Sequence, residues 1–329
     1  MSWYFEKGNE SDVVVSTRIR FARNVAGMKF HGKMSDEDEQ ELIKKFKKVD
    51  DLKLYKLSDI DDITKLSLAE KHILSKDILD RKNGAFLLSD DESVCVMLNE
   101  EDHIRIQVVN TGLDFKNAYN IAKQVDERIS NIVKYAYNDK YGYLTTCPTN
   151  LGTGLRVSVM LHLPALRITG RIQRVLDVIN KVNVTVRGVY GEGTSAIGDM
   201  YQLSNKVSLG VKEEDIINSI KKITDTIIKK EREAREFLKK RGIEFEDKIS
   251  RMYGTLLYAR KIDYNECAKL ISNIKLGVDM GIIKNVDLEK VNKVRTLAKA
   301  ASLQKYYKSK LDADERDVKR AELIKEILN

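Results

Sequence analysis

Apolar and polar side chains alternate along residues 155–163, and this pattern predicts a β-strand. Every odd position in the segment is leucine or valine. The even positions carry Arg156, Ser158, Met160 and His162. Because successive side chains of a strand point to opposite faces, one face of this strand is expected to lie in a core. Pro164 ends the strand, since it has no N–H to donate to a neighbouring strand.

The same alternation occurs in residues 13–21, VVVSTRIRF. Its apolar positions predict a second strand that buries one face. On the other face, Arg18 and Arg20 stand two positions apart and are expected to project side by side. Two interpretations fit this pair: a solvated sheet face, or a clamp for an anion.

A run of three acids, Glu-Glu-Asp, interrupts the β-like pattern of residues 93–109. Acidic residues are depleted in strands, and local sequence rules tend to fail in this way at functional sites. If the strand is continuous, Glu101, His103 and Arg105 share one face, which places a carboxylate next to a cation. The alternative is a hairpin turn that happens to be acidic.

Other periodicities predict the remaining elements. Helices are expected at 36–48, 116–137, 168–182 and 213–238, and strands at 85–88, 183–189 and 201–205. A helix or loop at 66–81 carries His72. Strand signals end near residue 240, and helices are then expected at 253–260, 265–276, 288–303 and 313–328. We therefore predict two domains, residues 1–240 and residues 241–329, the first an α+β domain because its strands and helices follow no regular βαβ order.

Composition narrows the class of protein. The chain has 329 residues, of which 42% are hydrophobic and 33% charged, as is usual for a globular protein. No apolar run reaches the roughly 20 residues of a membrane span, and the polar amino terminus does not resemble a signal peptide. Cys95, Cys147 and Cys267 are far apart, which argues against structural zinc or disulfides and predicts a cytoplasmic protein.

The net charge of +8 favours an anionic partner such as a nucleotide, a nucleic acid or an acidic protein. Basic and acidic residues are interspersed, which is more typical of solvated helices than of a DNA-binding surface. Five arginines lie on polar faces of four predicted strands, namely Arg18, Arg20, Arg105, Arg156 and Arg187. On one sheet face they would repel one another unless a polyanion bound there, and a triphosphate with Mg²⁺ suits guanidinium groups. The glycine loop at 152–154 is expected to offer backbone N–H groups to the same anion.

Four segments resemble the catalytic motifs of phosphagen (guanidino) kinases. They are STRIR at 16–20, NEEDHIR at 99–105, CPTNLGTGLR at 147–156 and RGVYGEGT at 187–194. Their order and approximate spacing also match, and the resemblance covers about residues 10–240. It implies the antiparallel, glutamine-synthetase-like sheet of that family, flanked by helices.

The resemblance also implies roles for individual residues. The expected ATP-binding residues are Ser16, Thr17, Arg18, Ile19, Arg20, His72, Arg105, Arg156, Val157, Ser158, Val159, Met160, Arg187, Gly188, Val189, Tyr190, Gly191 and Glu192. Glu101 is expected to orient the guanidinium and act as general base. Glu192, on a glycine-rich loop able to close over a ligand, is expected to hold the other guanidinium nitrogens. Cys147 is expected to add a thiolate charge, with a buried structural thiol as the alternative.

Two departures from the small-molecule kinases concern the substrate. Those kinases carry a helical domain before the first motif, whereas here that motif begins at Ser16 and helices follow the catalytic region. This arrangement is similar to that of bacterial protein-arginine kinases. In addition, RDVKRA resembles their RDxxRA motif for allosteric phosphoarginine binding, comprising Arg316, Asp317, Val318, Lys319, Arg320 and Ala321. Two arginines four residues apart share a helix face and could chelate phosphate, although a charged helix end gives the same pattern.

The sequence therefore predicts a protein-arginine kinase that uses ATP and Mg²⁺ and forms a homodimer. By resemblance, its products would pass to a Clp-type unfoldase or protease in the stress response, a stress-gene repressor is a possible substrate, and an activator protein is possible. Neither direct nucleic-acid binding nor membrane association is expected. Two alternatives stay open: a kinase for a free guanidino compound, and a nucleotide-binding adaptor or nucleic-acid-binding protein without catalysis.

Overall fold

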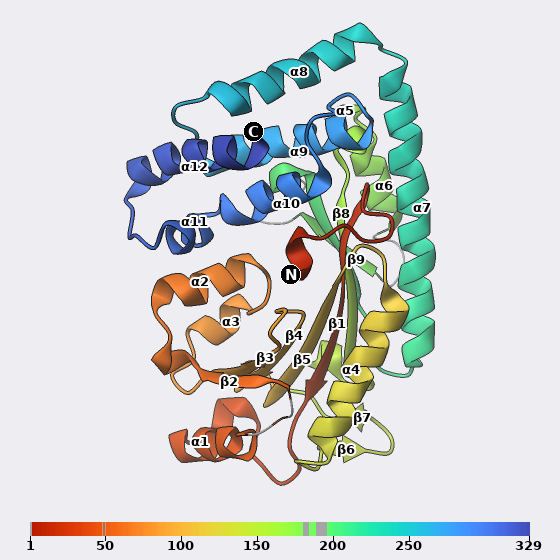
Figure 1. Ribbon diagram of the computed structural model, residues 1–329. Coiled ribbons are helices and arrows are strands. Elements are labelled where there is room, and N and C mark those ends of the chain that lie inside the picture. The colour runs from red at the N-terminus through yellow and green to blue at the C-terminus, as the bar shows by residue number, and fades with distance from the viewer. Residues whose placement is uncertain (1, 48, 50, 180–183, 189–195) are drawn as a thin grey trace.

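An eight-stranded antiparallel sheet forms the centre of the catalytic region (Figure 1). The computed structural model describes residues 2–47, 49, 51–179, 184–188 and 196–329. In spatial order the strands are β2 (Lys53–Lys56), β3 (Ala85–Leu88), β4 (Val94–Leu98), β5 (Ile104–Thr111), β1 (Val14–Arg23), β8 (Leu155–His162), β10 (Met200–Asn205) and β9 (Val184–Gly188). A separate hairpin pairs β6 (Tyr137–Asn138) with β7 (Gly142–Tyr143).

Helices α1 to α7 surround this sheet. They are α1 (Asp36–Lys45), α2 (Asp62–Glu70), α3 (Lys76–Leu79), α4 (Phe115–Ser130), α5 (Pro164–Ile168), α6 (Ile172–Ile179) and α7 (Glu213–Lys239). The face opposite the arginines is covered by α4, which packs on β1 and β5, and by α7, which packs on β8 and β10. The predicted inward positions of β1 and β8, including Ile19, Phe21 and Val157, are fully buried in this core.

The other face of the sheet is covered only in part. Over β3, β4 and β5, a second apolar cluster joins the strands to α2, α3 and the segment around Trp3 and Tyr4. Phe86, Met97 and Val109 contribute the strand side of this cluster. The arginine-bearing half of the same face has no such apolar cover among the residues that the structure describes.

The acidic segment is a turn, so the interpretation of residues 93–109 as one continuous strand is wrong. β4 ends at Leu98 and β5 begins at Ile104, and Asn99 has a φ of +60°. The Asn99 N–H donates to the His103 carbonyl at 3.0 Å and closes the turn. His103 is fully buried, and its Nδ1 accepts from the Val25 N–H, so it does not share a face with Glu101.

Several predicted helices are divided or shifted in the structure. Residues 66–81 cover the end of α2, a connection that contains His72, and α3; His72 has a φ of +62°, which is not helical. Of the helix predicted at 168–182, Ile168 ends α5 and residues 172–179 form α6, while residues 180–182 lie outside the described residues. The helix α4 ends seven residues before the predicted residue 137, at Ser130. In the C-terminal part, the helix expected at 253–260 begins ten residues earlier, at Ile243.

Five C-terminal helices gather above the sheet in the view of Figure 1. They are α8 (Ile243–Tyr258), α9 (Tyr264–Asp279), α10 (Leu288–Leu297), α11 (Ala300–Tyr307) and α12 (Ala313–Leu328). None of the helices that the structure describes has the length and apolar composition that a bilayer crossing requires.

A helix cap links the C-terminal helices to the catalytic part. Glu70, at the end of α2, accepts hydrogen bonds from the N–H groups of Ala301 and Ser302 at 2.9 and 2.8 Å, and from the Ser302 hydroxyl at 2.8 Å. A carboxylate at the first turn of α11 satisfies N–H groups that have no partner inside the helix and interacts favourably with the helix dipole. Glu70 thus caps a helix of the other region.

Candidate active site

The register of the sheet brings the arginines of the central strands onto one face. Arg20 on β1 lies directly opposite Arg156 on β8. Its partner on the other side is Gln107 of β5, and Arg105 is two residues from that position. Because paired residues of antiparallel strands point to the same side and the side-chain period is two, these three arginines and Arg18 project from the same face.

Arg187 joins this group from the far edge of the sheet. It pairs with Gln202 of β10, and Gln202 pairs with Met160 of β8. Met160 is four residues from Arg156, so both point to the same side. The prediction that five arginines share one sheet face is confirmed, and we call the set of Arg18, Arg20, Arg105, Arg156 and Arg187 the arginine face.

The positive charges of the arginine face repel one another. Burial lowers the pKa of Arg20 well below its usual value, and repulsion from Arg18, Arg105 and Arg156 lowers it further. The Nε atoms of Arg20 and Arg156 are buried, and no group in the described part of the chain accepts a hydrogen bond from them. Buried donors of this kind are suited to an anion, which would accept their hydrogen bonds.

Neutral side chains hold several of these guanidinium groups in place. Arg18 donates from Nε to the Ser158 hydroxyl at 3.2 Å and from Nη2 to Gln202 Oε1 at 3.0 Å. Arg156 donates to the Ser204 hydroxyl at 3.3 Å. Such partners orient an arginine without neutralising it, so its charge stays available to phosphate oxygens.

Glu100, one acid of the turn, forms the ion pair with Arg105 that the continuous-strand interpretation assigned to Glu101. Its carboxylate is 1% exposed and bonds to Arg105 Nη1. Burial alone would raise the pKa of Glu100, but the Arg105 guanidinium and hydrogen bonds from Ser75 and the Glu101 amide outweigh it and lower the pKa. The sequence argument missed Glu100 because it assumed that side chains alternate between two faces, and this alternation does not hold within a turn.

Glu101 is only partly buried and is suited to accept a proton. Burial raises its pKa, and the neighbouring charges of Asp102 and Glu100 raise it further, while Arg105 opposes them. A carboxylate with a raised pKa is a stronger base than an ordinary glutamate. Burial and repulsion from Arg187 and Arg105 lower the pKa of Arg156, and the nearby Cys147 and Glu101 oppose this shift.

Asp102 joins the acidic turn to the segment that carries Cys147. It is 2% exposed and accepts from Asn24 Nδ2 at 2.6 Å and from the Thr146 N–H at 2.7 Å. Cys147 is partly exposed, and its Sγ lies 3.0 Å from the Thr149 hydroxyl. The alternative of a buried structural thiol is therefore wrong for Cys147.

The glycine loop serves packing within the protein. A Cβ on Gly152 would lie 2.4 Å from the Ser208 carbonyl oxygen, and one on Gly154 would lie 2.4 Å from Arg23 Nη1. The N–H of Gly152 donates to Tyr143 and that of Thr153 to Ser208. The prediction that this loop offers free N–H groups to an anion is wrong for these two, because neighbouring carbonyls already accept them.

His72 stands beside the arginine face, between α2 and α3. Burial lowers its pKa well below the usual value, and the positive charges of Lys299, Arg18 and Arg295 lower it further. The imidazole is consequently neutral near pH 7. Together with Ser16 and Met160, His72 lines a small cavity that reaches Arg18.

Comparison with known proteins places this geometry in a family. The model described as ATP:guanido phosphotransferase, C-terminal catalytic domain, matches residues 33–234. The model described as Protein-arginine kinase McsB C-terminal domain matches residues 242–329. The chain belongs to the protein-arginine kinase family of ATP:guanido phosphotransferases.

Relatives named protein-arginine kinase match nearly the whole chain. The protein of Bacillus subtilis is 42% identical, over 100% of this chain and 93% of its own length. The protein of Clostridium acetobutylicum is 39% identical, over 99% of both chains. The recognised family and the kind of enzyme, a phosphotransferase, are thereby confirmed.

Solved structures confirm the fold class. A duplicated taurocyamine kinase from Schistosoma mansoni, with bound transition-state-analogue components, is 27% identical and has a TM-score of 0.59 over 67% of this chain and 33% of its own. A lombricine kinase, 24% identical, has a TM-score of 0.59 over 69% of this chain and 68% of its own. These proteins share the antiparallel sheet of the catalytic region.

Within the predicted ATP-binding segments, only alternate side chains reach the arginine face. Thr17, Ile19, Val157 and Val159 are completely buried on the opposite side of the sheet. Their side chains therefore cannot contact a ligand bound on the arginine face. Val189, Tyr190, Gly191 and the second predicted acid, Glu192, lie outside the residues that the structure describes.

The RDVKRA segment lies on α12, and its two arginines already have partners. Arg320 is 2% exposed and donates to the carbonyls of Ala298 and Ile262 at 2.7 and 2.8 Å, and to Asp317 at 2.6 Å. Arg316 donates to the Leu311 carbonyl at 2.9 Å. Joint chelation of a phosphate by both arginines requires Arg320 to exchange these bonds.

Proposed function

We propose that this enzyme transfers the γ-phosphoryl group of ATP to the guanidinium group of arginine side chains in proteins. The observation that carries the proposal is the meeting of the arginine face with Glu101, a carboxylate of raised pKa. The relatives named protein-arginine kinase, which span this whole chain, support the choice of a protein substrate.

Each group has a chemical task in this proposal. The bond between the β,γ-bridging oxygen and γ-phosphorus breaks while a guanidinium nitrogen forms a bond to that phosphorus. Guanidinium has a pKa above 12 and no free lone pair, so a proton must leave the attacking nitrogen, and Glu101 accepts it. The arginine face holds the phosphate oxygens as their charge redistributes, with Mg²⁺ arriving on the nucleotide.

Phosphosite mapping tests the proposal. The full chain is incubated with γ-labelled ATP and a reduced, unfolded protein rich in arginine. We expect label on arginine, lost in acid as is usual for P–N bonds, and little label with Glu101→Gln. Label on free arginine but not on protein would favour the free-guanidino alternative. ATP binding without any transfer would favour the adaptor alternative.

We further propose, from the resemblance of residues 316–321, that phosphoarginine binds this segment and activates the enzyme. Arg316 is the cleaner probe, because Arg320 is buried and holds three backbone and side-chain acceptors. Arg316→Met should reduce activation by added phosphoarginine and leave ATP affinity unchanged. An equal loss of ATP affinity would contradict this assignment.

Partners of the protein are also proposals. A homodimer is supported by exposed apolar side chains on α8, where Ile243 is 79% and Tyr258 81% exposed. Light scattering on the eluted protein tests it, and Ile243→Glu should favour the monomer. Delivery of phosphorylated proteins to a Clp-type protease rests on the family resemblance, and a degradation assay with a mapped substrate tests it.

A further inference from the structure

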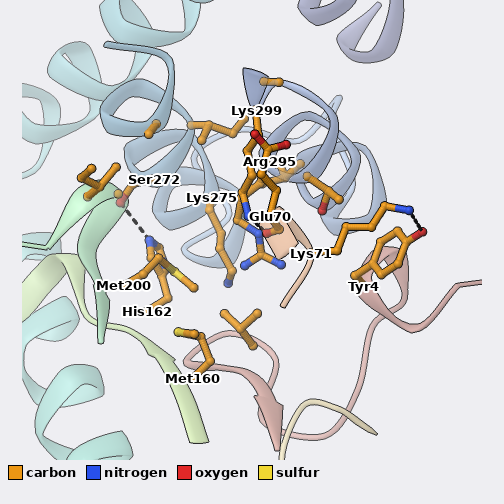
Figure 2. A pocket seen from close by; sticks show the side chains of 18 of the residues that line it. Tyr4, Glu70, Lys71, Met160, His162, Met200, Ser272, Lys275, Arg295 and Lys299 are labelled. Carbon is orange, nitrogen blue, oxygen red and sulfur yellow. Dashed lines mark hydrogen bonds between the residues drawn. The ribbon is translucent and has the colours of Figure 1, made fainter. Parts of the chain in front are cut away.

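A second cavity lies where the C-terminal helices meet the sheet (Figure 2). It contains about 960 Å³ of empty space, part of it open to solvent. Ser16, His72 and Met160 line it from the catalytic region, and Ser272 on α9 and Arg295 on α10 line it from the C-terminal helices. Cavities between two regions of a protein are a common place for small molecules and cofactors to bind.

Arg295 has an incomplete set of partners at this cavity. Its Nη1 atom is buried, and no group among the described residues accepts a hydrogen bond from it. Burial lowers the pKa of Arg295 to about 10. Figure 2 shows its guanidinium at the centre of the cavity, pointing toward Met160. A buried, unsatisfied cationic donor is unfavourable for folding, so its position indicates a bound group that accepts hydrogen bonds.

The cavity adjoins a smaller cavity beside the arginine face. The small cavity beside Arg18 is lined by Ser16, His72 and Met160, and the same three residues line the larger cavity. A ligand whose phosphates lie on the arginine face can therefore extend past these residues toward Arg295. The larger cavity is also mainly apolar, with Met200 and Ile271 in its wall, which suits a heteroaromatic base.

We propose that the nucleoside end of ATP occupies this cavity and that Arg295 binds it, so that the C-terminal helices complete the nucleotide site. The inference rests on the proposed use of ATP. A guanidinium group only donates hydrogen bonds, so its partner is an acceptor of the nucleoside, either a ring nitrogen or a ribose oxygen. Arg320 bonds to the Ala298 carbonyl at the end of α10, so the RDVKRA segment and the nucleotide cavity share one helix.

Calorimetry with two ligands tests the proposal on the full chain. Arg295→Gln should weaken MgATP binding about tenfold or more, because a hydrogen bond from a charged donor is lost. Its affinity for magnesium tripolyphosphate, which has the phosphates but no nucleoside, should stay within about twofold. Lys284→Met, which removes an exposed positive charge from the same region, is the control and should change neither affinity.

Three outcomes would overturn the proposal: unchanged ATP affinity in a folded Arg295→Gln protein, equal losses for both ligands, or an effect of Lys284→Met as large as that of Arg295→Gln. The wild-type protein gives a second test that does not depend on the variant. Trp3, the only tryptophan of the chain, lines both cavities. Saturating MgATP should change its fluorescence and magnesium tripolyphosphate should not, and unchanged emission with ATP would also overturn the proposal. Both tests measure nucleotide binding, so their results do not depend on whether the enzyme phosphorylates arginine.

Discussion

Two groups of arginines in this protein differ in their partners. Arg23, on the same strand as Arg20, is completely buried and makes a two-bond ion pair with Asp126 at 3.1 and 2.8 Å. It also donates to the carbonyls of Ala22 and Thr153 and stacks over the Tyr143 ring, with its Cζ 3.6 Å from the centroid. The arginine face, by contrast, contains buried Nε atoms without acceptors in the described structure.

The difference shows that burial alone does not assign a role to an arginine. A charge whose donors are all satisfied, as in Arg23, holds elements of the fold together. A group of arginines that repel one another and keep unsatisfied donors reduces stability until an anion binds. We therefore expect substitutions in the first group to affect folding and substitutions in the second group to affect ligand binding and catalysis.

The largest effect is expected on the arginine face. Arg156→Ala should lower kcat by about 10³- to 10⁵-fold, which corresponds to about 4–7 kcal/mol, because a charge that stabilises the transferring phosphoryl group is lost. The free energy of unfolding should stay equal or rise, since repulsion from Arg187 and Arg105 is relieved. Steady-state kinetics and urea unfolding measure the two quantities. A destabilised Arg156→Ala enzyme would show that Arg156, like Arg23, stabilises the fold.

Glu101→Gln should lower kcat by about 10²- to 10⁴-fold, the usual contribution of a general base. The raised pKa of Glu101 also predicts the pH dependence of the wild type. The carboxylate must be ionised to accept a proton, so activity falls as the pH drops through that pKa. The acidic limb of the kcat profile should thus lie above the ordinary glutamate pKa of about 4.3. A limb at the ordinary value, or near-normal turnover of Glu101→Gln, would remove the assignment.

Asp126 is the ion-pair partner of Arg23, the arginine that holds elements of the fold together. Asp126→Ala should lower the free energy of unfolding by about 3–5 kcal/mol, because Arg23 is left as an uncompensated buried charge. The kcat per folded molecule should change little, and the loss of activity on warming should follow the loss of folded protein. Thermal and urea unfolding give the first quantity. A stable Asp126→Ala protein with a large fall in kcat would contradict the division of the arginines into two groups.

The smallest effect concerns the cap between the two regions. Glu70→Ala should lower stability by about 0.5–2 kcal/mol, as is usual when a helix loses its capping side chain. The cap lies at the first turn of α11, so amide hydrogen exchange should increase there more than in α7. Glu127→Ala, at an exposed position beyond the first turn of α4, is the control and should change neither measurement.

The sequence predicted much of the site because the period of a strand is strict. Once Ile19 and Val157 were assigned to the core, the parity of their strands placed Arg20 and Arg156 on the other side. The arginine face followed from that pattern, whereas the antiparallel sheet was implied by the resemblance to phosphagen kinases. The same argument could not predict the side-chain directions at residues 99–103, because these residues form a turn and do not alternate between two faces. Glu100 was missed for that reason.

Contacts between distant segments were beyond the reach of the sequence. The pair of Arg23 and Asp126 spans 103 residues. Strand parity places Arg23 on the core face with Ile19 and Phe21, but it does not identify the acid that pairs with it. Arg295 has the sequence pattern of any charged residue on an amphipathic helix, and only the packing of α10 against α9, α12 and the N-terminal segment at residues 3–5 buries it. Period and composition describe single elements, whereas such sites arise from tertiary packing.

The most direct test of the central claim is the free energy of unfolding of Arg20→Met, measured by urea with and without MgATP. Without nucleotide, we predict a protein at least as stable as the wild type, because a repelled, incompletely bonded cation is removed. MgATP at 100 times its wild-type Kd should stabilise the wild type by about 2.7 kcal/mol and the variant by far less. A variant that is unstable alone, or that gains the full stabilisation from MgATP, would contradict the account.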